Sequence, residues 1–501
     1  MNKKRPHILF LQTDQHRFDA LGCVNPVVKT PHLDSLVARG IRFSQAVCNS
    51  PMCVPSRYSM MTGLYPSQCG IRHNTQMSCR DEDMVIDTIA QRMQNSGYAT
   101  AGFGKAHWYI GIPDEHDPAK VPTTDTSTRG FEVRAQARNI EPVTNEKGAM
   151  IWGEEDPEAI RLLSKENEGI RTGGENAPGY IGLTSMFDPE RTREGWLTRH
   201  AINYLNSRDG DERPMFLYLS FDFPHALLNP PKQYEDMYDI NDIILPKNHV
   251  PIETLDDHYN QPRNVEEWRS WREDYSEEEQ KRSLLRYYAA CTYVDDLFGN
   301  VLHQLETMGE LDNTLILFTS DHGESLGERY RFSKYSHYEA SVRVPLVVAG
   351  AGVDESKHGT IDDRCCSLVD IVPTFLSAAT MARDERMVGY NLLDDPAMMG
   401  SFSELHGSGY HEIEKAPVYM WRTQEWKLIL YIPGEFRNLD SRMEDLKGEL
   451  YQHQKDPLES HNLYDEPEHL AIREQLTRHL LMHLAIAWSR FPRPYSYTDL
   501  R

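Results

Sequence analysis

The amino-acid sequence contains, at residues 53–63, the stretch C-V-P-S-R-Y-S-M-M-T-G. Pro55 suits the first position of a helix, because its fixed φ is preformed for that position and no backbone N–H is needed there. Cys53 would then lie just before the helix, where backbone N–H groups and the helix dipole favour negative charge. Arg57 would lie near the same anion. The stretch therefore predicts a nucleophile beside an anion-binding cradle; the alternative is a buried cysteine next to a turn.

These eleven residues match every fixed position of the signature C/S-x-P-S-R-x-x-x-x-T-G. Through them the chain resembles the sulfatase family of the alkaline-phosphatase-like superfamily. The resemblance implies that a dedicated maturation enzyme oxidises Cys53 to formylglycine. One hydroxyl of the hydrated aldehyde would attack sulfur, and deprotonation of the other would later expel sulfate. The resemblance thus implies a geminal diol as the nucleophile, since a thiolate would give a poorer cycle.

A second stretch, at residues 97–107, reads G-Y-A-T-A-G-F-G-K-A-H and resembles the family signature G-Y-x-T-x-x-x-G-K-x-H. The resemblance implies that Lys105 binds a sulfonyl oxygen and that His107 lies beside the formylglycine hydroxyl. The family usually has Trp before this His, whereas here Ala106 precedes it and Trp108 follows it. We expect Trp108 either at the mouth of the substrate site or in packing.

Two buried strands are predicted to end in metal ligands. Residues 7–13 (H-I-L-F-L-Q-T) read as a parallel strand followed by Asp14 and Gln15, and residues 311–320 read as another, followed by Asp321 and His322. Open α/β sheets bind ligands at this end of their strands.

The resemblance implies that these four side chains hold one divalent cation next to residue 53. The family often has a second Asp at the position of Gln15, so this residue is a departure. Three oxygen ligands and one imidazole suit Ca²⁺, with Mn²⁺ or Zn²⁺ as alternatives because of the nitrogen.

Two further segments carry candidate catalytic residues. Residues 214–221 read as a buried strand followed by Pro224 and His225, which matches a P-H pair of the family. Lys334 begins a segment similar to the family's K-x-x-x-Y-E…R-V-P-L. The resemblance implies that Lys334 bridges the sulfate and the leaving oxygen, and that His225, with Lys334, protonates the departing alcohol.

The roles of the remaining site residues follow from the same resemblance. His107 would take a proton from the second hydroxyl of the diol, so that the aldehyde reforms and sulfate leaves. Arg57, Lys105 and Lys334 would supply the positive charge that an anionic ester needs in its ground and transition states.

The elements together predict an α/β fold with a large mixed, mostly parallel sheet sandwiched by helices, and a smaller C-terminal domain of antiparallel sheet plus helix. The expected domains are residues 1–400 and 401–501. Helices are expected over residues 84–94 and, as one long helix or a broken pair, over residues 276–308. Residues 109–190 and 232–275 show weak periodicity and are interpreted as insertions that set substrate specificity.

Composition limits the function. The net charge of −23 argues against a nucleic-acid-binding protein, so an anionic substrate requires a local basic pocket. The eight cysteines show neither metal-site spacing nor a disulfide framework, and we expect mostly reduced, buried thiols. No signal peptide or membrane span is recognised, which predicts a cytoplasmic protein that makes no membrane contact. The oligomeric state stays open, with a homo-oligomer among the alternatives.

The interpretation that results is a sulfuric ester hydrolase acting on a small sulfated sugar or oligosaccharide fragment. Four residues near the motifs are candidate sugar-binding side chains, although each alone is also explained by packing or surface exposure: Arg72, His73, Asn74 and Trp108. Two rival functions remain. One is a phosphonate monoester or phosphodiester hydrolase of the same superfamily, and the other is a non-catalytic binder of sulfated glycans.

Overall fold

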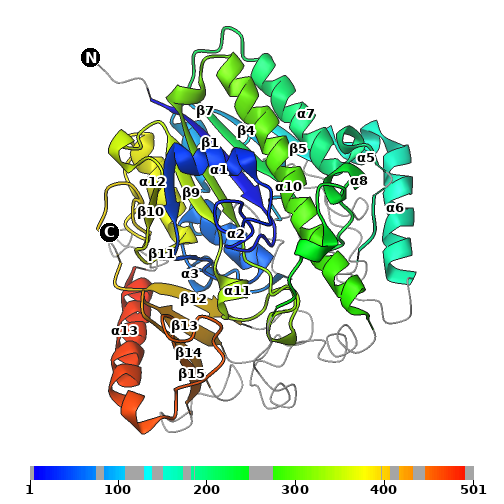
Figure 1. Ribbon diagram of the computed structural model, residues 1–501. Coiled ribbons are helices and arrows are strands. Elements are labelled where there is room, and N and C mark those ends of the chain that lie inside the picture. The colour runs from blue at the N-terminus through cyan, green and yellow to red at the C-terminus, as the bar shows by residue number, and fades with distance from the viewer. Residues whose placement is uncertain are drawn as a thin grey trace, which may run out of the picture.

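The structure, a computed structural model, describes residues 5–74, 84–107, 129–137, 150–172, 182–185, 187–246, 275–396, 398–406, 417–432 and 446–490. Its centre is a nine-stranded sheet with the strand order β10-β2-β9-β8-β1-β7-β4-β5-β6 (Figure 1). The strands are β1 (His7–Thr13), β2 (Gly40–Phe43), β4 (Ala99–Gly104), β5 (Val133–Gln136), β6 (Met150–Ile151), β7 (Met215–Ser220), β8 (Thr314–Ser320), β9 (Leu346–Gly350) and β10 (Thr360–Asp362).

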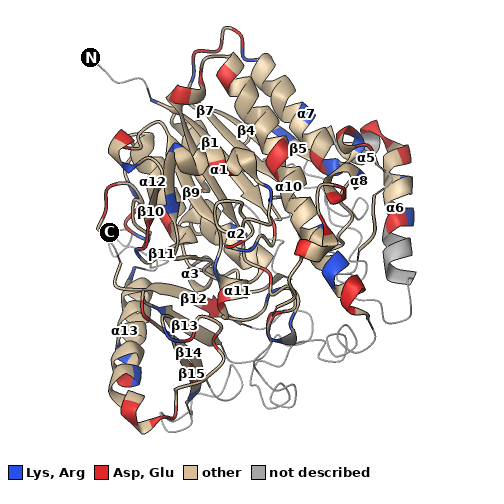
Figure 2. Ribbon diagram, viewed as in Figure 1, with Lys and Arg blue, Asp and Glu red and all other residues tan. Residues whose placement is uncertain are grey.

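Most neighbouring strands of this sheet are parallel. The six strands from β8 to β6 run in the same direction, whereas β9 is antiparallel to both β8 and β2. The predicted mixed, mostly parallel sheet is therefore confirmed. The central strands β1, β7 and β8 contain no charged residue (Figure 2), as expected for strands covered on both faces.

Helices cover both faces of the sheet (Figure 1). Ile8 and Phe10 of β1 belong to the same buried cluster as residues of the helices α2 (Cys53–Thr62), α4 (Ile89–Asn95) and α12 (Ile371–Ala378). Leu9 and Leu11 belong to the opposite cluster, with α1 (Pro31–Ala38), α7 (Arg193–Asn206) and α10 (Glu277–Thr307). Successive side chains of a strand point to opposite faces, so a continuous apolar run supports two cores.

Several helices begin or end at other residues than the sequence predicts, or resolve an alternative that it left open. The segment from residue 277 to 307 forms one unbroken helix, capped by Ser276 with the predicted capping box. In contrast, α4 begins at Ile89 instead of residue 84, because Thr88 accepts the backbone N–H of Gln91 as its N-cap. Helix α2 begins at Cys53 itself, so Pro55 is its third residue and not its first. Pro is tolerated there since the first four N–H groups of a helix have no partner within the helix.

Part of the stretch interpreted as an insertion over residues 109–190 belongs to the main sheet. Strands β5 and β6 extend the sheet beyond β4, and α5 (Trp152–Glu155) and α6 (Pro157–Thr172) follow them. These strands have four and two residues, which is too short for a clear alternation in the sequence.

A second sheet lies towards the C-terminus, as predicted. Strands β12 (Ser401–Leu405), β13 (Val418–Arg422), β14 (Trp426–Tyr431) and β15 (Lys447–Gln452) are antiparallel in this order. Helix α13 (Leu470–Ser489) covers one face through Leu476 and Leu480 (Figure 1). The remaining short elements are β3 (Ala46–Val47), which pairs with β11 (Cys366–Ser367), and the helices α3 (Pro66–Cys69), α8 (Lys232–Glu235) and α11 (Glu339–Val342).

The predictions about cysteines and about membrane-spanning helices can be compared with the described residues. The seven cysteines among them are present as thiols, of which Cys23 is exposed, Cys69 is partly buried and the others are buried. Among the described helices, none combines the length and apolarity that crossing a lipid bilayer requires.

Candidate active site

Side chains from four neighbouring strands meet at one edge of the main sheet. Asp14 follows β1, Lys105 follows β4, Asp222 follows β7, and Asp321 follows β8. Because β8, β1, β7 and β4 are adjacent and parallel, their carboxyl ends place these residues together. The N-terminus of α2, with Cys53, faces the same point.

Four candidate metal ligands are close together and buried. One ligand atom each from Asp14, Cys53, Asp321 and His322 lies within 4.8 Å of the others. The Cys53 Sγ atom is 3.1 Å from His322 Nε2 and 4.0 Å from Asp14 Oδ1. His322 Nδ1 lies 2.9 Å from the carbonyl oxygen of Gly323 and donates to it, so that Nε2 is the nitrogen that faces the cluster.

Positive charges surround this cluster. Arg57 donates from Nε to Asp321 Oδ2 at 2.7 Å and from Nη2 to Asp14 Oδ2 at 3.0 Å. Lys105 Nζ lies 2.7 Å from Asp14 and 3.1 Å from Asp222. A protein with a large negative net charge thus contains a fixed cationic pocket, which electrostatic binding of an anion requires.

The surroundings of Cys53 favour its ionised form. Burial and the nearby Asp14 raise the pKa of the thiol, but Lys334, His322 and a hydrogen bond from His107 outweigh them and hold the pKa well below its usual value. Burial lowers the pKa of His107 to about 4, although its hydrogen bond with Cys53 acts in the opposite direction. His107 is therefore a neutral imidazole next to residue 53 at neutral pH.

Gln15 and Lys334 lie side by side although they are 319 positions apart. The Gln15 backbone N–H donates to Asp321 Oδ1 at 3.1 Å, and its side-chain oxygen accepts from Lys334 Nζ at 2.8 Å. Gln15 and His107 have positive φ angles of 64° and 59°. Such backbone is costly for residues other than glycine and is concentrated at functional sites.

The structure contains the other predicted catalytic residue beside Lys334. His225 Nε2 lies 2.8 Å from Lys334 Nζ. Its Nδ1 lies 2.5 Å from the carbonyl oxygen of Ala226 and donates to it. Since the Lys334 ammonium can only donate, His225 accepts from it at Nε2.

Two residues of this site were missed by sequence reasoning. Asp222 holds Lys105 at 3.1 Å and Arg193 at 2.8 Å, and these cations, despite burial, lower its pKa to about 2. Glu324 accepts a hydrogen bond from the Gln15 side chain. A signal was present for each, because Asp222 comes two residues after a buried strand and Glu324 closes the stretch D-H-G-E.

The predicted sugar-binding residues have different outcomes. Asn74 is buried, and its Oδ1 accepts the backbone N–H of Val54 at 3.1 Å, so it supports the first turn of α2. Arg72 and His73 are partly buried, and burial together with His406 and Arg72 lowers the pKa of His73. Trp108 lies outside the described residues.

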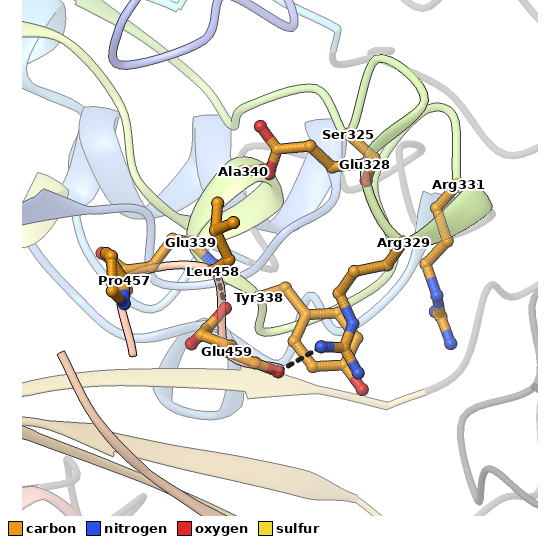
Figure 3. Close-up of a pocket in the computed structure, with 10 residues that line it drawn as sticks. All are labelled: Ser325, Glu328, Arg329, Arg331, Tyr338, Glu339, Ala340, Pro457, Leu458 and Glu459. Atoms are coloured by element: carbon orange, nitrogen blue, oxygen red, sulfur yellow. Dashed lines mark hydrogen bonds between the residues drawn. The ribbon is translucent and has the colours of Figure 1, made fainter. Parts of the chain in front are cut away.

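A second group of potential metal ligands lies among the described residues. Glu339, His453 and Glu459 lie close enough to share an ion, but Lys427 Nζ already lies 2.6 Å from Glu339 and 2.5 Å from Glu459. A small cavity adjoins this group, between the segment 325–340 and residues 457–459 (Figure 3). There the Arg329 guanidinium covers the Tyr338 ring at 4.0 Å. The charges are matched by protein groups, which indicates a structural role.

The first cluster fits a divalent cation better. Two buried carboxylates close together repel each other, and the nearby Asp14 adds to burial in raising the pKa of Asp321. A cation between them would relieve this repulsion, and His322 Nε2 offers an additional ligand. Oxygen ligands with one imidazole are compatible with Ca²⁺ and with Mn²⁺ or Zn²⁺.

Comparison with known proteins found two matching family models and related sequences. Residues 6–381 match the family model Sulfatase, and residues 327–485 match the model N-sulphoglucosamine sulphohydrolase, C-terminal. The chain is 26% identical over 497 residues to the arylsulfatase of Clostridium perfringens, covering 96% of this chain and 94% of that protein.

Two solved structures share the fold. The phosphonate monoester hydrolase of Agrobacterium radiobacter has a TM-score of 0.75 at 23% identity and covers 96% of both chains. A protein solved in complex with its substrate D-glucosamine-2-N,6-O-disulfate has a TM-score of 0.69 at 22% identity, covering 98% of this chain and all of the other. At these identities the likeness concerns the fold alone.

Proposed function

Because the chain belongs to the sulfatase family, we propose that this sulfatase cleaves O-sulfate esters with Cys53 converted to formylglycine by a maturation enzyme. One observation supports this most directly. Cys53 lies against His322 and Asp14 and faces three cations, Arg57, Lys105 and Lys334, whose charges act on it or on its carboxylate neighbours. A nucleophile in a buried cationic pocket suits attack on an anionic ester.

The metal would be bound by the carboxylates Asp14 and Asp321, the imidazole of His322 and the side-chain oxygen of Gln15. We propose Ca²⁺, which would polarise the sulfate oxygens when bound. Arg57 holds Asp14 and Asp321 in place through two hydrogen bonds, so that neither carboxylate has to reorganise. Lys105 and Lys334 would bind the sulfate oxygens.

The protons move between groups that the fold holds next to each other. The hydrated formylglycine would supply one hydroxyl as the nucleophile and a second as the proton source for sulfate release. His107, neutral and hydrogen-bonded to residue 53, would accept that second proton. Lys334 and His225 would supply the proton that the departing alcohol oxygen takes when its bond to sulfur breaks.

The deciding test of this function has two parts. Mass spectrometry of protein made with the maturation enzyme should find formylglycine at residue 53 and unmodified thiols at the other cysteines. The same preparation should release sulfate from an aryl sulfate, and a chelator should stop the release. Full activity with only cysteine at residue 53 would refute the proposed nucleophile, and an unmodified, inactive protein that binds sulfated glycans would favour the non-catalytic alternative.

A phosphonate monoester hydrolase is the second candidate, because such an enzyme has the same fold. Lys105 and His107 favour sulfate, since relatives of the phosphonate type tend to lack this pair. Turnover of an aryl sulfate and of a phosphonate monoester should be compared under the same conditions. A higher kcat/KM for the phosphonate would overturn the preference for sulfate.

For the natural substrate we propose a small sulfated sugar or oligosaccharide fragment. One relative in fold was solved with the disulfated sugar D-glucosamine-2-N,6-O-disulfate as its substrate. Arg72 and His73 would contact such a substrate, and Arg can pair with a carboxylate or a second sulfate. Sulfate release from mono-, di- and polysaccharides would test this, and a preference for long polymers or for simple alkyl sulfates would contradict it.

The domain division remains a proposal as well. We infer a catalytic domain over residues 1–400 and a smaller domain over residues 401–501, in which the four-stranded sheet begins at Ser401. Cytoplasmic location is also part of the proposal.

A further inference from the structure

Glu324 connects two parts of the active site that belong to different segments of the chain. Its side chain is 1% exposed, and both carboxylate oxygens accept hydrogen bonds. Oε1 accepts the backbone N–H groups of Leu326 at 2.8 Å and of Ser333 at 2.5 Å. Oε2 accepts from Nε2 of Gln15. We propose that Glu324 is a positioning residue that orients the Gln15 amide towards the metal and fixes the start of the Lys334 segment.

The orientation of an amide follows from its partners. The Gln15 side chain has an NH₂ group, which only donates, and an oxygen, which only accepts. Because Lys334 Nζ, a donor, lies on one side of this amide, the NH₂ group must face Glu324 on the other side. The oxygen must then face the opposite side, where Lys334 Nζ donates to it at 2.8 Å. The residue as a whole is tied to the metal cluster, because its backbone N–H donates to Asp321 Oδ1 at 3.1 Å.

The second contact of Glu324 acts on the backbone that carries Lys334. Ser333 and Tyr335, on either side of Lys334, have positive φ angles of 67° and 69°. These conformations are unfavourable for residues with a side chain and require surrounding contacts to hold them. The carboxylate binds the Ser333 N–H, and the Tyr335 N–H donates to the carbonyl oxygen of Pro51 at 3.1 Å, beside the Cys53 loop.

The pairing of Gln15 with Glu324 gives a physical reason why position 15 has an amide, where the family often has a second Asp. A carboxylate in place of Gln15 would face the buried carboxylate of Glu324 with no donor between them. Like charges at such a distance inside a protein repel strongly. Gln15 and Glu324 are therefore a matched donor and acceptor. A count of ligand charges alone would instead predict that a carboxylate at position 15 binds the cation more tightly.

The inference rests on the proposed metal site, and calorimetric Ca²⁺ titration of the full chain tests both. Glu324→Gln should lower the Ca²⁺ affinity about 10- to 100-fold, as for other residues that orient a metal ligand. The new amide would face Gln15 donor to donor or lose the backbone N–H groups. Gln15→Glu should also lower the affinity, although it adds a negative ligand.

The double variant Gln15→Glu with Glu324→Gln provides the decisive comparison. It exchanges donor and acceptor, so the amide at position 324 can donate to the carboxylate at position 15. Its Ca²⁺ affinity should exceed that of both single variants. Glu328→Gln is the matched control, because this nearby carboxylate binds Arg17 and not Gln15, and it should leave the affinity unchanged.

The outcomes distinguish the two proposals. Wild-type protein that binds no divalent cation would refute the metal site itself and the orienting role with it. Normal Ca²⁺ affinity in Glu324→Gln, or a tighter site in Gln15→Glu, would overturn the matched pair while leaving the metal site intact. If Glu324→Gln does not fold, as judged by circular dichroism, the comparison of Gln15→Glu with the double variant still decides.

Discussion

Lys334 Nζ lies 2.8 Å from Nε2 of His225, although the two residues are 109 positions apart in the chain. Lys334 is held in its charged form, since burial lowers its pKa but residues Cys53, Tyr335 and Asp14 raise the pKa well above its ordinary value. A charged lysine beside an imidazole can supply the proton that a leaving oxygen takes. The two side chains therefore form one proton-donating unit.

Hydrolysis rates of substrates with different leaving groups should reveal the proton-donating role of Lys334 and His225. His225→Asn and Lys334→Met should each slow hydrolysis of an alkyl sulfate about 100-fold or more, because its alkoxide needs a proton. An aryl sulfate with a nitrophenolate leaving group should lose much less. The double variant should be no slower than the slower single variant, since residues that act together are not additive. Equal losses for both substrates would contradict the role, and His303→Asn on the surface of α10 serves as the control.

Removal of the proposed nucleophile should abolish turnover without unfolding the protein. Cys53→Ala takes away a single sulfur atom at the start of α2, and we expect sulfate release to fall about 1000-fold or more. Circular dichroism and thermal unfolding should match those of the wild type. Cys291→Ala, which removes another buried thiol far along the chain on α10, should keep its activity. A Cys53→Ala rate within tenfold of the wild type would rule out the assignment.

Loss of one carboxylate should remove the metal. Asp321→Asn replaces a charged ligand by a neutral amide and also weakens the bond to Arg57. We expect Ca²⁺ affinity to fall about tenfold or more, and activity to fall with it. Asp295→Asn is a suitable control, because Asp295 is also buried but accepts the backbone N–H groups of His32 and Leu33. Unchanged metal content in Asp321→Asn would show that this residue is not a ligand.

The contact between the small sheet and the Lys334 segment should dominate stability. Lys427 of β14 is fully buried and binds the carbonyl oxygen of His337 as well as Glu339 and Glu459. Lys427→Met leaves the buried Glu459 carboxylate without its cation, although Glu339 keeps Arg422, so unfolding free energy should fall by about 3–5 kcal/mol. Arg282→Met breaks an exposed pair with Glu278 and should cost less than about 1 kcal/mol. Similar losses of unfolding free energy for Lys427→Met and Arg282→Met, measured by urea unfolding, would refute this prediction.

Stability should decrease as the pH falls below about 6.5. Burial, with Arg490, lowers the pKa of His483 from 6.5 to about 4 in the folded protein. Between these values the unfolded chain binds the proton more tightly, so the contribution of His483 to the unfolding free energy falls as the pH drops from 6.5 to 4 and is constant below 4. The full shift corresponds to about 3 kcal/mol. In His483→Gln this slope should be smaller, whereas His303→Gln should retain it; an unchanged slope in His483→Gln would exclude this contribution.

Local patterns in the sequence were sufficient for the central strands of the main sheet and for the long helix α10. The apolar runs of β1 and β8 predict buried strands, and Ser276 followed by Glu279 predicts the start of α10. The two motifs around Cys53 and Lys105 also predicted residues that the structure brings together. These features depend on neighbours within a few positions, where backbone preference and side-chain periodicity act directly.

The tertiary structure alone decided which distant residues share the site and what holds them there. Gln15, Glu324 and Lys334 meet because β1 and β8 are adjacent parallel strands and the chain after β8 turns back over their ends. Lys427 supports the Lys334 segment from a separate sheet. A local pattern cannot encode such contacts, since the free energy that creates them comes from burial and charge pairing between segments hundreds of residues apart.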